Sequence, residues 1–444
     1  MGTGRRSGWM PVSVAQDNLL SRRRSALARG ERYRPLNIPQ RLNVVRVDVG
    51  RAEAAMARVI RRHDALRMEM RWDGAAAWQR PVEQPTFQIR ELGRFPDLSA
   101  VHDAEDWDQD FDMSEVPRVR GYAASLPDTD LLIFVFDHAV VDGIGVEVAL
   151  REFAAFYGSP VGQSVPVDSE PLQFNDFIRW EANEFSGQNL LRHLEFWEGL
   201  LSGVGLEPHL DLPFVRPPQT RGSLPTMEAR LRWGPDETKR VRDSAIAWSA
   251  TPFIVMFAAL KAQLACYGAS PTGIAATIAN RRPPFLDVVG WLFHNIIVPV
   301  HFRRDDELSS VVPRTRDEIF RIRRYEGVPH QVLLRELEPA RFGQLRSVPA
   351  LVLNYLKPSD PVLLDGNLVT AEDLPSRRRD ALVIELAIAQ TLVSTDLALY
   401  FPLGVLEPDV GRMFIEDYVA MVRALVSAPS GRIGDVPLSL AANG

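Results

Sequence analysis

The chain has 444 residues, of which 46% are hydrophobic and 24% are charged, and its formal net charge is −6 at pH 7. This composition is typical of a globular protein and excludes disordered, fibrous and membrane classes. The acidic balance gives no general attraction to nucleic acid or to anionic lipid, so we expect neither as a partner.

The compartment follows from the same features. The longest apolar stretches, residues 253–260 and 296–300, are far shorter than the roughly 20 residues that a membrane-spanning helix needs. No apolar segment of signal-peptide length follows Arg5 and Arg6. The single cysteine, Cys266, excludes an internal disulfide and a multi-thiolate metal site. We therefore expect a cytoplasmic protein with no membrane segment.

A chain of this length divides most easily into two domains of about 200 residues each. The first half predicts an extended segment at 42–49, an amphipathic helix over 54–66, a strand at 131–136 and a helix at 146–157. A loop rich in Pro, Gly, Ser and Val follows at 158–171. We place the boundary in this loop, which gives domains 1–165 and 166–444.

The second half continues the mixture of helices and strands. Its clearest helix covers 252–267, because Thr251 is a good N-cap, Pro252 a good first residue and Gly268 a good stop. Other helices are predicted at 175–185, 190–201 and 408–426, and strands at 273–279, 296–302, 350–355, 382–389 and 394–400, the last two as an antiparallel hairpin. The expected fold class is α/β (α+β).

His138 is the histidine whose surroundings suggest chemistry. It follows the predicted strand at 131–136 directly, at a junction where a rigid scaffold can aim a side chain into a cleft. A neutral imidazole can take a proton from an amine or hydroxyl that attacks a carbonyl, which typically contributes ~10²- to 10⁴-fold in rate. Asp142 would orient the imidazole or pair with a buried arginine, and Gly143 and Gly145 permit a tight backbone path. Taken without any family, the pattern favours a structural histidine.

A longer match changes this interpretation. His138, Asp142 and Gly143 match the signature His-His-x-x-x-Asp-Gly, which follows a strand in the condensation domains of nonribosomal peptide synthetases. Other segments agree with that family in order and spacing, at residues 11–16, 62–67, 175–180, 196–197, 251–253, 279–281, 289–291 and 328–329. From about Pro11 to Leu425, the chain therefore resembles these domains, which belong to the chloramphenicol acetyltransferase-like superfamily.

The resemblance implies a fold and a reaction. The fold would be two chloramphenicol acetyltransferase-like subdomains in a V-shaped pseudo-dimer, with an active-site tunnel between them. The acyl donor would be a thioester on the phosphopantetheine arm of an acyl or peptidyl carrier protein. The acceptor would be an amine or alcohol, either a free small molecule or one held on a second carrier protein. No bound cofactor and no metal are implied.

The resemblance also assigns roles to residues at the site. His138 would act as the general base, or would position the attacking nitrogen by hydrogen bonding. Asp142 would be structural and paired with an arginine, because an isolated buried carboxylate is costly. Arg281 is the first candidate for that arginine, and Arg67 is the second.

Two positions depart from the family pattern. Asp137 replaces the first histidine of the signature, and its carboxylate would favour an imidazolium at His138 if both face the same space. Asp137 and Asp142 together also resemble the Asp-x-x-x-x-Asp motif of heterocyclisation relatives. Against that alternative, His138 is retained and Gly145 stands where those relatives have a serine.

The second departure lies further along the chain. His294 and Asn295 stand where the family usually shows Asn-Thr. We expect Asp137, Trp291, His294 and Asn295 to contact substrate, although a hydrogen-bonded strand-end position explains His294 equally well. The arginine runs at 22–24 and 377–379 are read first as solvated faces, with docking of an acidic carrier protein as the alternative.

Taken together, these features predict a free-standing, monomeric condensation enzyme, because we find no adenylation, carrier or thioesterase segment beside the matched region. It would join a carrier-bound acyl or aminoacyl group to an amine, or less often to an alcohol. Two alternatives stay open. One is a stand-alone O-acyltransferase that uses acyl-CoA or carrier thioesters, and the other is a catalytically silent condensation-like module that recruits partner enzymes.

Overall fold

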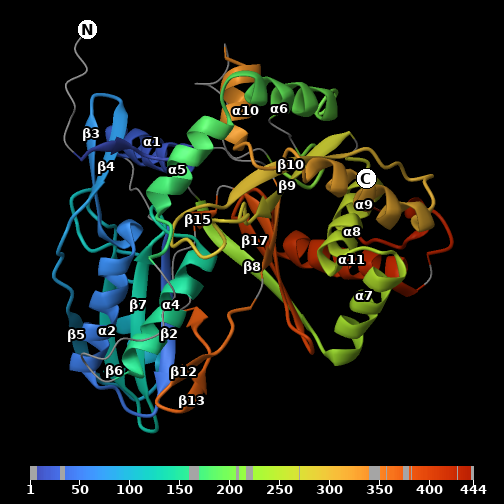
Figure 1. The fold of residues 1–444 in the computed structure, drawn as a ribbon. Helices are drawn as coiled ribbons and strands as arrows, with labels where there is room; N and C mark the ends of the chain where they lie inside the picture. The colour runs from blue at the N-terminus through green and yellow to red at the C-terminus, as the bar shows by residue number, and fades with distance from the viewer. Residues whose placement is uncertain are drawn as a thin grey trace. The chain divides into compact units, whose positions relative to one another are not determined.

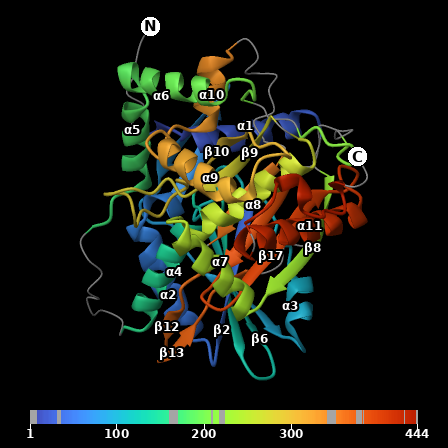
Figure 2. The same cartoon turned by 90° about the vertical axis from the view of Figure 1, so that its right-hand side faces the viewer.

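The computed structural model describes residues 8–30, 36–159, 170–206, 210–216, 224–269, 271–339, 351–356, 358–373, 380–381, 383–427 and 429–441. These residues form a mixed α/β structure, which confirms the predicted fold class (Figures 1 and 2). The chain divides into two compact units. The first comprises residues 1–185, 279–293 and 359–377, and the second comprises 186–278, 294–358 and 378–444. The boundary predicted between residues 165 and 166 lies outside the described residues.

The first unit contains two sheets and a small hairpin. The larger sheet has the strand order β14-β2-β7-β6-β5, the smaller has the order β1-β4-β3, and β12 pairs with β13. Its elements are β1 (Met10–Pro11), α1 (Val14–Ala28), β2 (Asn37–Val44), α2 (Val49–Arg62), β3 (Met68–Asp73), β4 (Ala76–Pro81), β5 (Ile89–Arg94), α3 (Leu98–Ala104), β6 (Val119–Ser125), β7 (Asp130–Asp137), α4 (Gly143–Tyr157), α5 (Phe174–Glu184), β12 (Val362–Leu364), β13 (Asn367–Val369) and β14 (Glu372–Asp373).

Strand β7 is buried on both faces, which explains its uninterrupted apolar sequence. Leu132, Phe134 and Phe136 pack into the large core that also holds α2 and α4. The alternating residues Leu131, Ile133 and Val135 face the opposite way, into a second cluster with α3. Figure 2 shows α2 and α4 on one face of this sheet and α3 on the other. The strand that leads to His138 is therefore held rigidly from both sides.

The extended segment predicted at 42–49 is only partly correct. Strand β2 covers Asn37–Val44, and residues 45–48 leave the sheet before α2 begins at Val49. The strand ends there because Val44 pairs with Asp130, the first residue of β7, so no partner continues beyond it. Asp48 then caps the helix, since its Oδ1 accepts a hydrogen bond from the backbone N–H of Arg51 at 3.0 Å.

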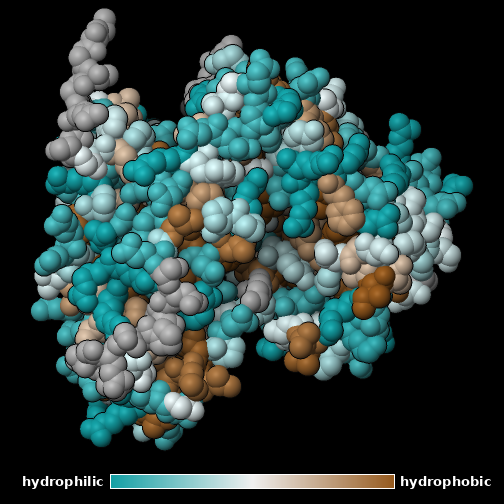
Figure 3. All heavy atoms as spheres, in the orientation of Figure 1, coloured by the Kyte–Doolittle hydropathy of each residue, from teal (hydrophilic) through white to brown (hydrophobic). Residues whose placement is uncertain are grey.

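Residues 359–377 return to the first unit late in the chain. Strand β14 pairs with the edge of β2, and β12 packs against α4. Leu363 and Leu368 face each other across the β12–β13 hairpin and are 59% and 74% exposed. Figure 3 shows a hydrophobic cluster where this hairpin lies in Figure 1.

The second unit is built on a seven-stranded sheet with the order β10-β9-β11-β16-β17-β8-β15. Its elements are α6 (Gly187–Leu200), β8 (Leu224–Trp233), α7 (Pro235–Ala247), α8 (Pro252–Cys266), β9 (Thr272–Ile278), β10 (His294–Val300), α9 (Leu308–Ile322), α10 (His330–Leu337), β11 (Leu351–Leu356), β15 (Asp380–Ala381), β16 (Ile384–Gln390), β17 (Thr395–Pro402) and α11 (Pro408–Ser427). Strands β16 and β17 form the predicted antiparallel hairpin.

Helix α8 is the central helix of this unit. Every residue from Ile254 to Cys266 is buried, and α7, α9 and α11 pack around it. The predicted start is confirmed, because the Thr251 hydroxyl accepts a hydrogen bond from the Ile254 N–H at 3.3 Å. Among the described residues, no single helix has the length and apolar character of a membrane span. Helices α7 and α8 reach that length only when taken together, and a bend of 96° separates them.

Candidate active site

The candidate site lies at the connection between β7 and α4 in the first unit. Strand β7 ends at Asp137, helix α4 begins at Gly143, and His138 starts the connection. The backbone N–H of His138 donates to the carbonyl of Leu36 at 3.0 Å, which extends the pairing with the β2 region by one residue. Asp142 is the N-cap of α4, with its Oδ1 accepting from the Gly145 N–H at 2.8 Å.

The Asp142 carboxylate joins this connection to residues 281–293. Its Oδ1 accepts from Nη2 of Arg281 at 2.6 Å, and its Oδ2 accepts from the backbone N–H groups of Leu292 at 2.9 Å and Phe293 at 3.2 Å. Arg281 also donates through Nη1 to the Val288 carbonyl at 2.7 Å. The side chains of Asp142 and Arg281 are only 2% and 5% exposed. Asp142 therefore links the β7–α4 connection to residues 281–293, which are far from it in the sequence.

Arg67, the second candidate partner for Asp142, lies elsewhere. Its guanidinium pairs with Asp64 and donates through Nη1 to the Val82 carbonyl at 2.9 Å. Asp64 is three residues away in sequence and Val82 follows the partner strand β4, so groups close to Arg67 bind its two terminal nitrogens. The expectation for Arg67 is corrected: it stabilises the turn before β3, and the arginine that binds Asp142 is Arg281.

Two glycines allow the connection to approach residues 288–293 closely. A Cβ atom on Gly145 would lie 2.6 Å from Cγ2 of Val141 and 3.1 Å from the backbone N and O of Gly290. A Cβ on Gly290 would lie 2.5 Å from the ring of Phe174. Gly143 differs, because a Cβ there would meet no atom within 4 Å. The close approach of the backbone therefore requires a glycine at position 145, whereas position 143 has room for a Cβ atom.

The aromatic side chains of Trp291 and Phe293 flank His138. The imidazole centroid lies 5.1 Å from the Trp291 ring and 5.4 Å from the Phe293 ring, with interplanar angles of 48° and 56°. The Trp291 side chain also carries a buried Nε1 with no hydrogen-bond partner among the described residues. Trp291 therefore lies at His138, where a substrate contact was expected, and Phe293 is an additional neighbour.

Burial controls the protonation of His138. The residue keeps partial exposure, but its Nδ1 is enclosed without a hydrogen-bond partner among the described residues. Burial lowers the pKa of the imidazole below its ordinary value near 6.5, while its own carbonyl, the carboxylates of Asp142 and Asp137, and the Val141 carbonyl act in the opposite direction. The lowered pKa favours the neutral imidazole at pH 7, which is the form that a general base needs.

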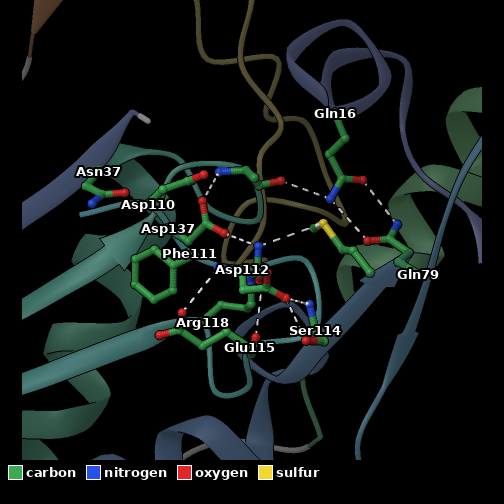
Figure 4. A network of polar contacts seen from close by, with 12 residues as sticks. Gln16, Asn37, Gln79, Asp110, Phe111, Asp112, Ser114, Glu115, Arg118 and Asp137 are labelled. Atoms are coloured by element: carbon green, nitrogen blue, oxygen red, sulfur yellow. Dashed lines mark hydrogen bonds and ion pairs between the residues drawn. The ribbon is translucent and has the colours of Figure 1, made fainter. Parts of the chain in front are cut away.

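Asp137 is held in a buried ion pair with Arg118 (Figure 4). The two side chains are 8% and 1% exposed, and Oδ1 of Asp137 also accepts from the Ala139 N–H at 2.9 Å. Arg118 donates through Nη1 to the carbonyls of Asp112 at 2.6 Å and Glu115 at 3.0 Å. The expectation that Asp137 lines a substrate space is not matched by this burial. Sequence reasoning missed Arg118, although a buried carboxylate requires a cation nearby.

Gln16 supports the connection from a third direction. Its Nε2 donates to the carbonyl of Ala139 at 2.9 Å and to Oε1 of Gln79 at 3.1 Å. Figure 4 shows this amide pair beside the Arg118 network. Gln16 belongs to the segment 11–16 that matched the family at its start, so the structure gives that match a physical role.

His294 and Asn295 lie in the second unit, at the start of β10. The His294 side chain donates through Nε2 to the Glu326 carbonyl at 2.6 Å, and the residue is 6% exposed. Oδ1 of Asn295 accepts from the Thr277 hydroxyl at 3.0 Å, across the β9–β10 pair. This geometry agrees with the strand-end interpretation of His294.

The first arginine run is partly engaged within the chain. Arg23 pairs with Asp110 at 2.6 Å, and Arg24 stacks over the Trp72 ring at 4.7 Å. The second run, residues 377–379, lies outside the described residues. No group of three His, Cys, Asp or Glu side chains within the described ranges is arranged to hold a metal ion.

Comparison with known proteins identifies the family. A model described as the Condensation domain matches residues 37–357, more than half of the chain. The chain therefore belongs to the condensation-domain family, which confirms the resemblance drawn from the motifs. Members of this family generally act as transferases that form acyl or peptide bonds.

Individual relatives support the same family. Phosphinothricin tripeptide synthetase PhsC of Streptomyces viridochromogenes is 29% identical over 412 residues, covering 88% of this chain and 36% of the synthetase. Chondramide synthase cmdD of Chondromyces crocatus is 24% identical over 403 residues, covering 88% of this chain but only 10% of the synthase. The chain thus spans about a third of the length of PhsC and about a tenth of the length of cmdD.

Solved structures agree on the fold. The X-domain from teicoplanin biosynthesis aligns with a TM-score of 0.80 at 20% identity, covering 98% of this chain and 99% of that domain. A mutant of the starter condensation domain of rhizomide synthetase RzmA, solved in complex with C8-CoA, aligns with a TM-score of 0.79 at 15% identity, covering 97% of this chain and 98% of that domain.

Proposed function

We propose that this chain is an acyltransferase that transfers an acyl or aminoacyl group from the phosphopantetheine thioester of a carrier protein to an amine. The observation that carries the proposal is the position of His138 at the end of β7, between Trp291 and Phe293, while the two neighbouring carboxylates, Asp137 and Asp142, are paired with Arg118 and Arg281. Burial lowers the pKa of the imidazole and so favours its neutral form. The imidazole is therefore available to a reacting proton.

The proposed reaction forms a C–N bond and breaks a C–S bond. The amine nitrogen attacks the thioester carbonyl carbon, and His138 takes the proton that this nitrogen loses. Collapse of the tetrahedral intermediate expels the phosphopantetheine sulfur, which receives that proton and leaves as a thiol. Nε2 is assigned as the reacting nitrogen, because Nδ1 is enclosed.

The nature of the acceptor decides how much His138 contributes. A neutral amine is already a competent nucleophile, so positioning by a hydrogen bond is sufficient for much of the effect. An alcohol must lose its proton during attack, and general-base assistance then matters more. We propose the amide-forming reaction and expect a larger penalty for loss of His138 if an ester is formed. Trp291 is proposed to contact the substrate, since it flanks the imidazole.

An O-acyltransferase that uses acyl-CoA is the first alternative, and the relative solved with C8-CoA gives it support. The test supplies one acyl group on a carrier protein and on CoA, with a panel of amines and alcohols, and detects products by intact mass. We expect amide product from the carrier thioester. Product from acyl-CoA and alcohols alone would establish the alternative instead.

A recruitment module is the second alternative. The X-domain of teicoplanin biosynthesis has been solved in complex with OxyB, and Asp137 departs from the catalytic signature of the family. Tight binding of a partner enzyme without turnover of any loaded carrier would favour this function. The free-standing state, the monomer, the cytoplasmic location and the possibility of a carrier-bound acceptor stay predictions.

A further inference from the structure

The ion pair between Arg118 and Asp137 controls the segment from which His138 projects. Asp137 is the residue before His138, and its Oδ1 holds the N–H of Ala139, the residue after it. The backbone N–H of Asp137 donates to the Arg118 carbonyl at 3.1 Å. Arg118 itself is fixed, because its own N–H donates to the Leu66 carbonyl at 2.8 Å and its Nη1 binds two further carbonyls. Backbone and side chain of Arg118 thus both fasten Asp137.

The charges around His138 are balanced in pairs. Asp137 and Asp142 are the carboxylates that act on the imidazole, and each has one buried arginine partner, Arg118 and Arg281 respectively. Asp110 adds a third carboxylate close to Asp137, and it is paired with Arg23 at 2.6 Å, with Arg118 and Arg120 also acting on it. Removal of one arginine would leave an uncompensated negative charge beside the imidazole.

We propose that Arg118 is a positioning residue for His138, acting through Asp137: its guanidinium cancels the Asp137 charge and fixes the turn that carries the imidazole. The proposal rests on the proposed function for its meaning in catalysis. In this chain the pair takes the place of the first histidine of the signature. An unpaired carboxylate at Asp137 would favour the imidazolium, which cannot accept a proton, so the arginine preserves the base as well as the geometry.

The test compares R118M, R118K, D137N and the double variant R118M/D137N. The first readout is the titration of the His138 imidazole by NMR, which needs no substrate, and the second is the acid limb of the pH profile of product formation. R118M is expected to raise the pKa of His138, because the Asp137 carboxylate left without its partner favours the imidazolium. D137N is expected to lower it, and R118M/D137N and R118K should return it close to the wild-type value.

A matched control separates this effect from loss of stability. Lys261 and Glu318 form another buried pair, in the second unit, with side chains 3% and 9% exposed. K261M should destabilise the fold to a similar degree without moving the His138 titration. D137N keeps the size of the side chain and an oxygen for the Ala139 N–H, so it provides a folded variant if R118M does not fold.

The outcomes distinguish the proposals. An unchanged His138 titration in both R118M and D137N would overturn the role of Arg118, whatever the activity. A wild-type protein that turns over no loaded carrier would overturn the proposed function, while the NMR titration would still decide the role of Arg118.

Discussion

Arg281 and Asp142 form a buried ion pair that joins positions 139 residues apart in the sequence, with 2.6 Å between Nη2 and Oδ1. The pair holds residues 288–293 against the connection that carries His138, and so brings Trp291 and Phe293 to the imidazole. Arg281 thus contributes both to the stability of the first unit and to the placement of Trp291 and Phe293 beside His138.

Loss of this arginine should be costly. R281A removes one partner of a buried pair and leaves the Asp142 carboxylate uncompensated, which typically costs about 3–5 kcal/mol in the free energy of unfolding. The matched control is R151A, because Arg151 forms an exposed pair with Asp287 in the same segment, with side chains 61% and 73% exposed. R151A should change stability by no more than about 1 kcal/mol. Urea denaturation measures both, and equal effects would contradict the structural role of Arg281.

Two neighbouring glycines should respond differently to one added methyl group. G145A places a Cβ 2.6 Å from Val141 and 3.1 Å from the Gly290 backbone, so overpacking should destabilise the protein by about 1–3 kcal/mol. G143A meets no atom within 4 Å and should be tolerated, since alanine also favours a helix. Thermal denaturation of the two variants gives the comparison. A G145A protein as stable as G143A would show that the close approach does not exist.

The pH profile of product formation should reflect the environment of His138. Burial lowers the pKa of the imidazole from its ordinary value near 6.5, so the base stays unprotonated through neutral pH. With an acceptor that does not itself titrate in this range, activity should therefore fall only as the pH decreases below 6.5. An acid limb centred above about pH 7 would mean that the imidazole is charged where we predict it to be neutral.

Glu181 gives a prediction on stability that is independent of activity. Burial raises the pKa of this α5 carboxyl from 4.5 to about 7, although a hydrogen bond from the Val14 backbone acts in the opposite direction. A raised carboxyl pKa means that the folded state loses stability as the pH rises from 4.5 to about 7. E181Q removes this penalty and should be more stable than the wild type at pH 8, by as much as ~3 kcal/mol. Urea denaturation at pH 4 and pH 8 tests this, with equal stability expected at pH 4.

Local patterns in the sequence predicted much of the fold. Helix α8 was predictable because Thr251 caps it and Pro252 opens it, and α11 because Pro408 marks its start. Strand β7 was predictable from its apolar run. The return of residues 279–293 and 359–377 to the first unit was not, because it depends on contacts between distant segments.

In the candidate site, too, the residues marked by local sequence were predictable and those that depend on distant contacts were not. The signature residues His138 and Asp142 were predictable from their spacing, and Arg281 was named as a partner because a buried carboxylate needs a cation. Arg118 was missed, since nothing in its local sequence marks it as the partner of Asp137. His294 and Asn295 were chosen by alignment, whereas their hydrogen bonds depend on strand pairing in the second unit.

The most direct measurement of the central claim is the rate of product formation by H138A from an acyl-loaded carrier protein and an amine. We expect a loss of about 10²- to 10⁴-fold with unchanged stability, while H301A, which removes an exposed histidine of the second unit, keeps the wild-type rate. A folded H138A protein that forms product at the wild-type rate would contradict the assignment of His138 as the group that handles the reacting proton.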